Sequence, residues 1–399
     1  MSGYIDSDYG SVVIAHPWLG LGGSEVAAMW TAQALQERYV TSIATLGGES
    51  LGNLNAFSGT NVGLEECVVR RPWWGGSMRM RAGDAMRGCL FQRYCRRIAG
   101  QYDVVVSAYN VCDCGRPAIH LVADFSGNAD VGDRGDRPGG ARGVFRHGVV
   151  RRGYLALSRA CRNPSGRDIW SGNDMIIANS RWSADVIEHL HGVHVDVLYP
   201  PVVGGFPDVS VSEKERGFVC IGRISPEKRI ERVIAILRAV RSRGHDCHLH
   251  VIGDSGSPYG QSIAALCREQ GGWIHMDGRK AGQEKKGLLA GHRFGIHART
   301  GEPFGIAVAE MVKAGCITFV PVEGGQAEIV NHPDLTYSDV DDAVNKIDRI
   351  LRDERREDAL RLHLKAQGEL FSTERFMAGI RAAVEQFLAT RGSQRKVAR

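Results

Sequence analysis

The chain has 399 residues, 43% of them hydrophobic, and a formal net charge of +5 at pH 7. This length exceeds one ordinary domain and predicts two domains with a cleft between them. The small basic excess does not by itself require a nucleic-acid or membrane partner. No secretory-signal pattern opens the chain and no run of about eighteen apolar residues follows, so we expect a cytoplasmic protein without a membrane span.

Ten cysteines are scattered from Cys67 to Cys316. Cys112 and Cys114 lie close together in the sequence, but no second cysteine pair or histidine pair follows at zinc-finger spacing. We therefore expect reduced, mostly packed thiols and do not expect a zinc site.

Short apolar strands alternate with helical or loop stretches through the first half of the chain. A strand at 11–15 precedes the glycine turn Gly20-Leu-Gly-Gly23 and a helix for which Ser24 is the expected N-cap. The further strands are expected at 40–46, 104–107, 119–122 and 175–178. This alternation predicts a parallel, doubly wound sheet.

Residues 200–217 are rich in proline, glycine and charge, as expected of a connector between domains. The α/β pattern then restarts with strands at 218–221, 248–252, 273–276 and 317–321 and helices at 230–241, 261–268 and 305–314. We divide the chain into an N-terminal domain (1–202), a C-terminal domain (203–372) and a final segment (373–399). In that segment a helix at 376–388 is long enough to reach back across the junction, and residues 391–399 are expected to be disordered.

Two glutamates flank the start of the helix expected at 305–314. The N–H groups of its first turn, following Glu302-Pro-Phe-Gly305, are expected to attract phosphate or sugar oxygens. Glu302 and Glu310 are eight residues apart. If both were helical they would lie roughly 12 Å apart and could hold two parts of a long ligand. Taken alone, a first-turn acid and a solvated helix residue are the simpler interpretation.

The loop Gly222-Arg-Ile-Ser-Pro-Glu-Lys228 lies between a strand and a helix, where an α/β sheet normally holds its ligand. The guanidinium of Arg223 and the ammonium of Lys228 suit a diphosphate. Considered by itself, the loop is equally consistent with two solvated cations.

Four segments together resemble the family 4 glycosyltransferases of GT-B architecture, in order and spacing, over about residues 11 to 330. They are Gly301–Met311 with its glutamate pair, Gly222–Arg229, Met175–Glu188 with Val197–Val202, and Leu19–Val26. The resemblance implies an α/β fold of two Rossmann-like, doubly wound domains that face each other across a cleft, with the C-terminal helix crossing back to the first domain. The first domain would bind the acceptor and the second the nucleotide sugar.

The resemblance also implies roles for individual residues. Glu310 would bond the ribose hydroxyls, while Arg223 and Lys228 would hold the diphosphate and stabilise the charge that develops on it. The sugar would be oriented by Glu302 together with the N–H groups of Phe304, Gly305 and Ile306. Gly22 and Gly23 would let the backbone of the first domain approach the donor.

Two histidines each have two possible roles in this scheme. His120 falls where the family carries a histidine near the transferred sugar, but a core or capping histidine is an equal alternative, and Asp124 is a rival polar contact. His297 lies just before Glu302, at the end of a strand that faces the cleft, so it would touch the acceptor or order the loop.

The implied reaction moves a sugar from a nucleotide sugar to an acceptor hydroxyl with retention of the anomeric configuration and without a protein nucleophile. A UDP-sugar is favoured and a GDP-sugar is the second option; no other cofactor is required. The Asp-x-Asp sequences at 6–8 and 339–341 are interpreted as solvated or capping acids. We therefore expect no essential metal.

Three other functions are consistent with parts of the sequence. A dinucleotide oxidoreductase would need a glycine where Glu25 stands in the motif that begins at Gly20. A phosphorylase-like or sucrose-synthase-like enzyme would use the same cations on phosphate. A noncatalytic binder of RNA or anionic lipid is suggested by eight arginines between Arg70 and Arg97, interleaved with aromatic residues. We expect a small-molecule, glycan or lipid-linked acceptor and no nucleic-acid partner. For the basic stretch we favour a mobile loop facing a soluble acceptor, with a solvated basic face and peripheral membrane contact as the alternatives.

Overall fold

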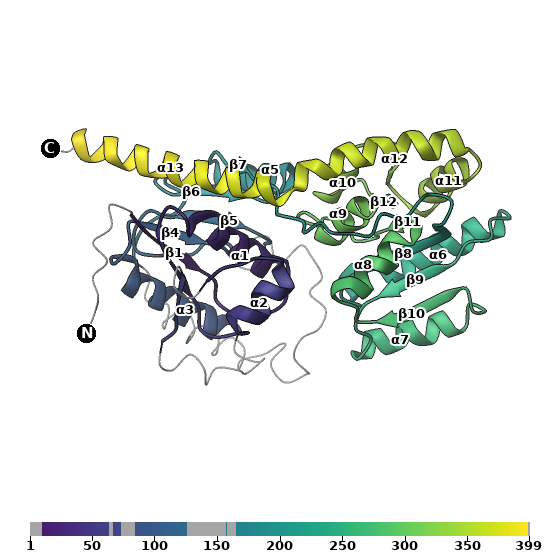
Figure 1. Ribbon diagram of the computed structural model, residues 1–399, viewed down its shortest axis with the longest axis horizontal. Coiled ribbons are helices and arrows are strands. Elements are labelled where there is room, and N and C mark those ends of the chain that lie inside the picture. Colours follow the sequence, from purple (N-terminus) through teal and green to yellow (C-terminus); the bar gives the residue numbers. More distant parts are fainter. Residues whose placement is uncertain (1–9, 64–66, 73–83, 126–156, 158–164, 398–399) are drawn as a thin grey trace.

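The computed structural model describes residues 10–63, 67–72, 84–125, 157 and 165–397. It contains two α/β domains, each built on a parallel sheet, and a long C-terminal helix that lies against both (Figure 1). This architecture confirms the predicted fold class of two Rossmann-like domains.

The sheet of the N-terminal domain has seven strands in the order β3-β2-β1-β4-β5-β6-β7, and the pairs are parallel. The strands are β1 (Ser11–Ala15), β2 (Val40–Ala44), β3 (Cys67–Arg70), β4 (Val104–Ser107), β5 (Ile119–Val122), β6 (Met175–Ala178) and β7 (Asp196–Val197). Strands β1, β4 and β5 are buried over almost their whole length, which is why they appear in the sequence as continuous apolar runs. The reversal of strand order beside β1 marks the edge where such sheets bind ligands.

The described helices of this domain are α1 (Gly23–Leu35), α2 (Leu51–Ser58), α3 (Asp84–Ala99) and α5 (Arg181–His191). The Ser50 and Ser180 side chains cap α2 and α5 by accepting backbone N–H bonds, and both helices end at a left-handed glycine. Helix α1 differs from the prediction, because its N-cap position is Gly22 and Ser24 lies inside the helix. The Ser24 hydroxyl donates to the Glu25 carboxylate instead.

The C-terminal sheet has six strands in the order β10-β9-β8-β11-β12-β13, again parallel. They are β8 (Glu215–Ile221), β9 (Leu249–Ile252), β10 (Ile274–Gly278), β11 (His292–Ile296), β12 (Ile317–Pro321) and β13 (Thr336–Tyr337). The first sheet ends at Val197 and the second begins at Glu215. Residues 215–217, expected in the connector, belong to β8.

Helices cover both faces of this sheet. They are η2 (Pro226–Lys228), α6 (Ile230–Ser242), α7 (Pro258–Arg268), α8 (Gly282–Ala290), α9 (Ile306–Lys313), α10 (Gln326–Val330), α11 (Val340–Leu351), α12 (Glu354–Gly368) and η3 (Glu369–Phe371). Asp339 caps α11 by accepting the Asp342 N–H, as a capping acid should. Asp6 and Asp8, the other Asp-x-Asp pair, lie outside the described residues.

Helix α13 (Thr373–Val397) starts beside the C-terminal domain and runs back over the N-terminal one (Figure 1). Its apolar residues Phe376, Ile380, Val384 and Phe387 belong to the core of the N-terminal domain. The Arg381 side chain donates to the Ala34 carbonyl at 2.7 Å. The expectation of disorder from residue 391 is wrong as far as Val397, because the helix continues to that residue.

Candidate active site between the two domains

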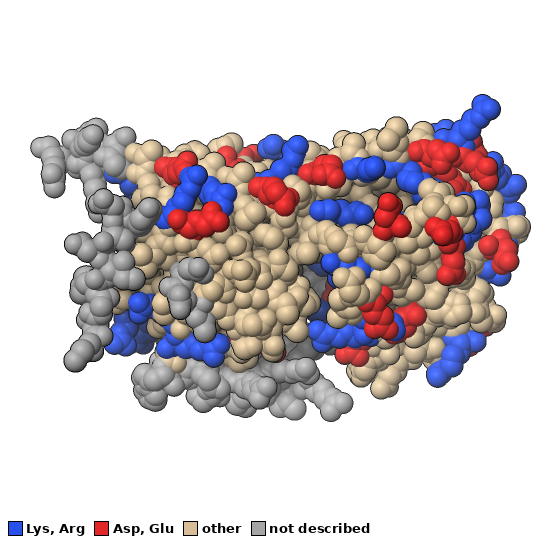
Figure 2. Space-filling view, viewed as in Figure 1, with Lys and Arg blue, Asp and Glu red and all other residues tan. Residues whose placement is uncertain are grey.

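The candidate residues of the C-terminal domain follow the carboxyl ends of its central strands. Strand β8 leads into the loop with Arg223 and Lys228, and β11 leads through His297 to Glu302. Because parallel strands end at the same edge, the two loops meet there. Figure 2 shows a recess at the boundary between the domains with lysine or arginine side chains along it.

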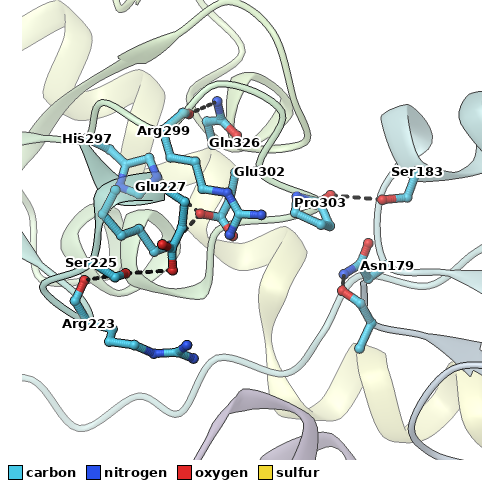
Figure 3. A network of polar contacts seen from close by, with 12 residues as sticks. Asn179, Ser183, Arg223, Ser225, Glu227, His297, Arg299, Glu302, Pro303 and Gln326 are labelled. Carbon is cyan, nitrogen blue, oxygen red and sulfur yellow. Dashed lines mark hydrogen bonds and ion pairs between the residues drawn. The ribbon is translucent and has the colours of Figure 1, made fainter. Parts of the chain in front are cut away.

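Glu302 is the centre of a charged cluster (Figure 3). Its Oε2 accepts a hydrogen bond from Lys228 Nζ at 2.5 Å and lies 3.3 Å from His297 Nε2. Its Oε1 accepts from Arg299 at 3.2 Å. The residue is only 9% exposed, so these groups replace water around the carboxylate.

These contacts fix the charge of the cluster. Burial alone would raise the pKa of Glu302, but Lys228, His297 and Arg299 outweigh it and hold the pKa well below the ordinary glutamate value. Burial lowers the pKa of His297, so its imidazole is neutral at pH 7. At neutral pH the cluster therefore consists of an ionised carboxylate, two cations and a neutral histidine.

The backbone of Glu302 is held by the following loop. Glu302 forms a β-bridge with Gly324, and its carbonyl accepts from the Gly325 N–H at 2.8 Å. A side chain on Gly324, whose φ is +119°, would strike the Glu302 backbone. The Gln326 amide donates to three carbonyls, those of Arg299, Pro321 and Glu323. Glu302 thus lies in a fixed turn before α9 and not in the first helical turn that the sequence suggested.

The N-terminal domain reaches this turn directly. Ser180 and Ser183, at the start of α5, both donate to the Pro303 carbonyl, at 2.5 and 3.1 Å. In return, the Glu328 carboxylate of α10 accepts the N–H groups of Arg181 and Trp182 at the same end of α5. A carboxylate at a helix N-terminus is favourable, so this contact stabilises the domain arrangement.

The predicted glycine loop also reaches the start of α9. A side chain on Gly23 would strike the Ile306 side chain of the other domain. The turn is closed by Glu25, whose carboxylate accepts from the Gly20 N–H at 3.2 Å and would crowd a side chain on Gly22. The structure therefore brings the glycines and the 304–306 segment together.

The remaining predicted donor residues have different surroundings. Phe304 is 2% exposed and its ring packs against Tyr199 and Phe371, so only its backbone is available to a ligand. Gly305 is left-handed, with φ of +101°, and immediately precedes α9. Glu310 accepts a hydrogen bond from Lys285 of α8 at 2.7 Å.

Arg223 is exposed. In Figure 3 its side chain passes below Glu302, and no hydrogen bond is drawn between the two.

His120 lies in the interior of the N-terminal domain. It is completely buried, and its Nε2 lies 3.2 Å from the carboxylate of Asp174, just before β6. These surroundings are those of the core-histidine alternative. Asp124 instead follows the carboxyl end of β5, where it accepts from the Asn110 amide at 2.8 Å.

The basic stretch is not the mobile loop that we expected, as far as it is described. Arg70 ends β3, and the arginines from Arg87 to Arg97 lie on α3. Arg93 and Arg97 are exposed, whereas Arg96 pairs with Asp113. Arg79 and Arg81 lie outside the described residues. Over the part of the chain that the structure describes, no helix combines the length and apolar character needed to cross a membrane.

Four residues of the site were missed by the sequence analysis: Lys285, Arg299, Gln326 and Glu328. Arg299 had a local signal, since it lies three residues before Glu302. The others lie on α8 (Lys285) and α10 (Gln326 and Glu328), and nothing in their own sequence surroundings distinguishes them from ordinary helix residues.

Comparisons with known proteins agree with this arrangement. Residues 206–369 match the model of the glycosyl transferases group 1 family. A GDP-Man:Man(3)GlcNAc(2)-PP-Dol alpha-1,2-mannosyltransferase of Candida glabrata is 28% identical over 38% of this chain. The match covers 34% of that protein's length.

Solved structures resemble the whole chain. Anabaena Alr3699/HepE, in complex with UDP and glucose, is 14% identical, with a TM-score of 0.65 over 95% of this chain and 100% of that one. WaaG, a glycosyltransferase involved in lipopolysaccharide biosynthesis, is 16% identical, with a TM-score of 0.62 over 92% and 99%. Sucrose-phosphate synthase from Thermosynechococcus elongatus is 14% identical, with a TM-score of 0.66 over 96% and 100%. The fold is therefore GT-B, and the family match supports a glycosyltransferase.

Proposed function

We propose that this chain is a retaining glycosyltransferase that moves a sugar from a nucleotide sugar to an acceptor hydroxyl. The observation that carries the proposal is the Lys228–Glu302 pair, which joins the two loops at the carboxyl edge of the C-terminal sheet. The start of α9, next to this pair, is where Gly23 of the N-terminal domain approaches Ile306. A cation, an ionised carboxylate and the backbone N–H groups at a helix start suit a sugar diphosphate.

Lys228 would act on both halves of the donor. Its ammonium has three N–H donors, of which one bonds Glu302. The others can reach the diphosphate, and the exposed Arg223 can supply a second cation. Charge grows on the diphosphate as the bond to the sugar breaks, so these cations stabilise the transition state more than the ground state.

Glu302 would orient the sugar and would not act as an acid. Because its pKa is held far below neutrality, it has no proton to give to the leaving group at pH 7. It can accept hydrogen bonds from sugar hydroxyls. In the proposed reaction the bond from the anomeric carbon to the diphosphate breaks, the acceptor oxygen forms a bond on the same face, and its proton passes to the departing diphosphate oxygen.

The N-terminal domain (1–202) would bind the acceptor and the C-terminal domain (203–372) the donor, with Glu310 on the ribose. We favour a UDP-sugar, in line with the UDP complex of the Anabaena protein, and a GDP-sugar is the rival suggested by the Candida relative. The transfer would need no metal, since Asp339 is engaged as a helix cap.

Two measurements test the proposal. Thermal-shift assays with UDP, GDP and ADP should show stabilisation by one base above the others, since a ligand at a hundred times its Kd stabilises by about 2.7 kcal/mol. The anomeric configuration of the product, determined by NMR, should equal that of the donor. An inverted product would refute the retaining mechanism. Consumption of inorganic phosphate or release of a free disaccharide would favour the phosphorylase-like or sucrose-synthase-like alternative.

A further inference from the structure

A second cluster of chemically active side chains lies at the other end of the C-terminal sheet. His248 immediately precedes β9 and His250 lies within it, while Glu215 and His292 are the first residues of β8 and β11. The donor site is at the carboxyl ends of these strands. Strand β8 has seven residues, which places the two sites roughly 20 Å apart.

The strand pairing brings these residues side by side. His250 pairs with Val219 of β8, and Glu215 pairs with His292, ahead of a register shift between β8 and β11. Side chains two residues apart on a strand share a face, so His248 lies on the face of His250. A side chain on Gly217, between Glu215 and Val219, would strike the His248 ring. Because Gly217 has no side chain, the His248 ring can lie across β8 toward β11.

Two distances from His248 match those between ligands of one metal ion. His248 Nε2 lies 3.2 Å from His292 Nε2 and 3.3 Å from Glu215 Oε2. Two ligand atoms on a tetrahedral zinc ion, each about 2.0–2.1 Å from it, are roughly 3.3 Å apart. One ring nitrogen from each of His248, His250 and His292 lies within 4.8 Å of the other two.

Two of the rings are already oriented for metal binding. His292 Nδ1 lies 2.7 Å from the Leu288 carbonyl, which can only accept, so the proton is on Nδ1 and Nε2 is bare in the neutral ring. His250 Nδ1 lies 2.8 Å from the Asp277 carboxylate, which leaves its Nε2 bare in the same way. Metal-binding histidines commonly have such a partner on the other nitrogen, because it fixes both the tautomer and the ring orientation.

We propose that Glu215, His248, His250 and His292 form a Zn²⁺ site at the amino-terminal edge of the C-terminal sheet. Imidazole and carboxylate ligands suit Zn²⁺, and three histidines with one carboxylate complete a tetrahedral set. A pocket of about 580 Å³, lined by Glu215, His248 and His250 among others, gives the ion a path from solvent. The ion joins strands β8, β9 and β11 and takes no part in sugar transfer.

This site could not be expected from motif spacing. Zinc-finger ligands come in pairs at short spacing along the chain, whereas these four residues come from the ends of three strands of a parallel sheet. Only His248 and His250 are close in the sequence.

Calorimetric titration of the untagged, chelator-stripped full-length chain with Zn²⁺ tests the site. We expect one ion per chain, and Co²⁺ in its place should give the visible absorption of a tetrahedral complex. Asp277→Asn should weaken Zn²⁺ binding about 10–100-fold by removing the partner of His250. His248→Gln and Glu215→Gln, both at partly exposed positions, should weaken it at least as much.

His194→Gln is the matched control. His194 is 82% exposed and has two carboxylates, of Glu188 and Asp196, each 3.4 Å away, but it belongs to the other domain. Its substitution should leave Zn²⁺ affinity unchanged. Absence of saturable binding to the wild-type chain, or equal affinity in His248→Gln and His194→Gln, would overturn the proposal. Because binding is measured without substrate, this result is independent of the proposed sugar transfer.

Discussion

Replacing Lys228 by methionine tests the charged cluster at the donor site most directly. The substitution keeps the side-chain length but removes the cation that lies 2.5 Å from Glu302. If Lys228 stabilises the departing diphosphate, its loss resembles the loss of one oxyanion donor, which lowers turnover about 10²–10³-fold. Nucleoside binding, which depends on other contacts, should change much less.

The same substitution should lower the free energy of unfolding. Removing one partner of a buried ion pair can cost about 3–5 kcal/mol. Glu302 keeps Arg299 at 3.2 Å and His297 at 3.3 Å, so we expect a smaller loss, about 1–3 kcal/mol. The control is Lys365→Met, at an exposed lysine of α12, which should change stability by no more than about 0.5 kcal/mol.

The pH dependence of this stability difference distinguishes the loss of the ion pair from a loss of side-chain packing. The pKa of Glu302 is depressed in the folded chain, so its stabilisation is fully present above the unfolded value of about 4.3 and is lost as the pH falls toward the folded pKa. Without Lys228 that pKa rises and the stabilisation shrinks. The wild-type and Lys228→Met chains should therefore differ most near pH 7 and converge in acid.

Urea unfolding at several pH values and initial rates with a confirmed donor give both readouts. A stability difference that stays constant from neutral to acidic pH would show that the charge of Glu302 is irrelevant. A variant that keeps wild-type turnover would refute the leaving-group role of Lys228.

The remaining predictions concern the ribose contact, metal and membrane. Glu310→Gln should weaken donor binding about tenfold or more in calorimetry without unfolding the chain, and unchanged affinity would remove Glu310 from the site. Turnover should persist in excess chelator even if thermal stability falls. If chelator abolished turnover and manganese or magnesium restored it, metal-independent transfer would be contradicted. Sedimentation with anionic liposomes should be weak, and strong, salt-sensitive binding that disappears on joint replacement of four arginines would favour a membrane-bound acceptor. The four are Arg70, Arg71, Arg93 and Arg97.

The sequence predicted the features that depend on local pattern. Buried parallel strands are continuous apolar runs, so β1, β4, β5 and β6 were placed at their observed bounds. Errors occurred at helix ends. Ser24 is a good capping residue, but Glu25 takes its hydroxyl and Gly22 occupies the cap. The last turns of α13 extend well into a segment whose composition alone suggested disorder.

The candidate site was predictable only as separate loops. The loops with Lys228 and Glu302 each show a recognisable motif, but their ion pair joins residues 74 positions apart. His120 has the position of a functional histidine in sequence, yet Asp174, 54 residues later, holds it in the interior. A single sequence does not specify such pairs, because each partner is individually an ordinary polar residue.

The geometry of the donor site depends on both domains, although most of its candidate side chains come from one. The Pro303 carbonyl, next to Glu302, is held by Ser180 and Ser183 of α5. The N-terminus of α5 is in turn held by Glu328. A shift of α5 against the C-terminal domain would therefore break these contacts, although the bridge to Gly324 and the Gly325 N–H would still hold the Glu302 backbone. The arrangement of the domains and the turn beside Glu302 are thus linked through the Pro303 carbonyl, so both domains help to position the carboxylate that we propose as the sugar contact.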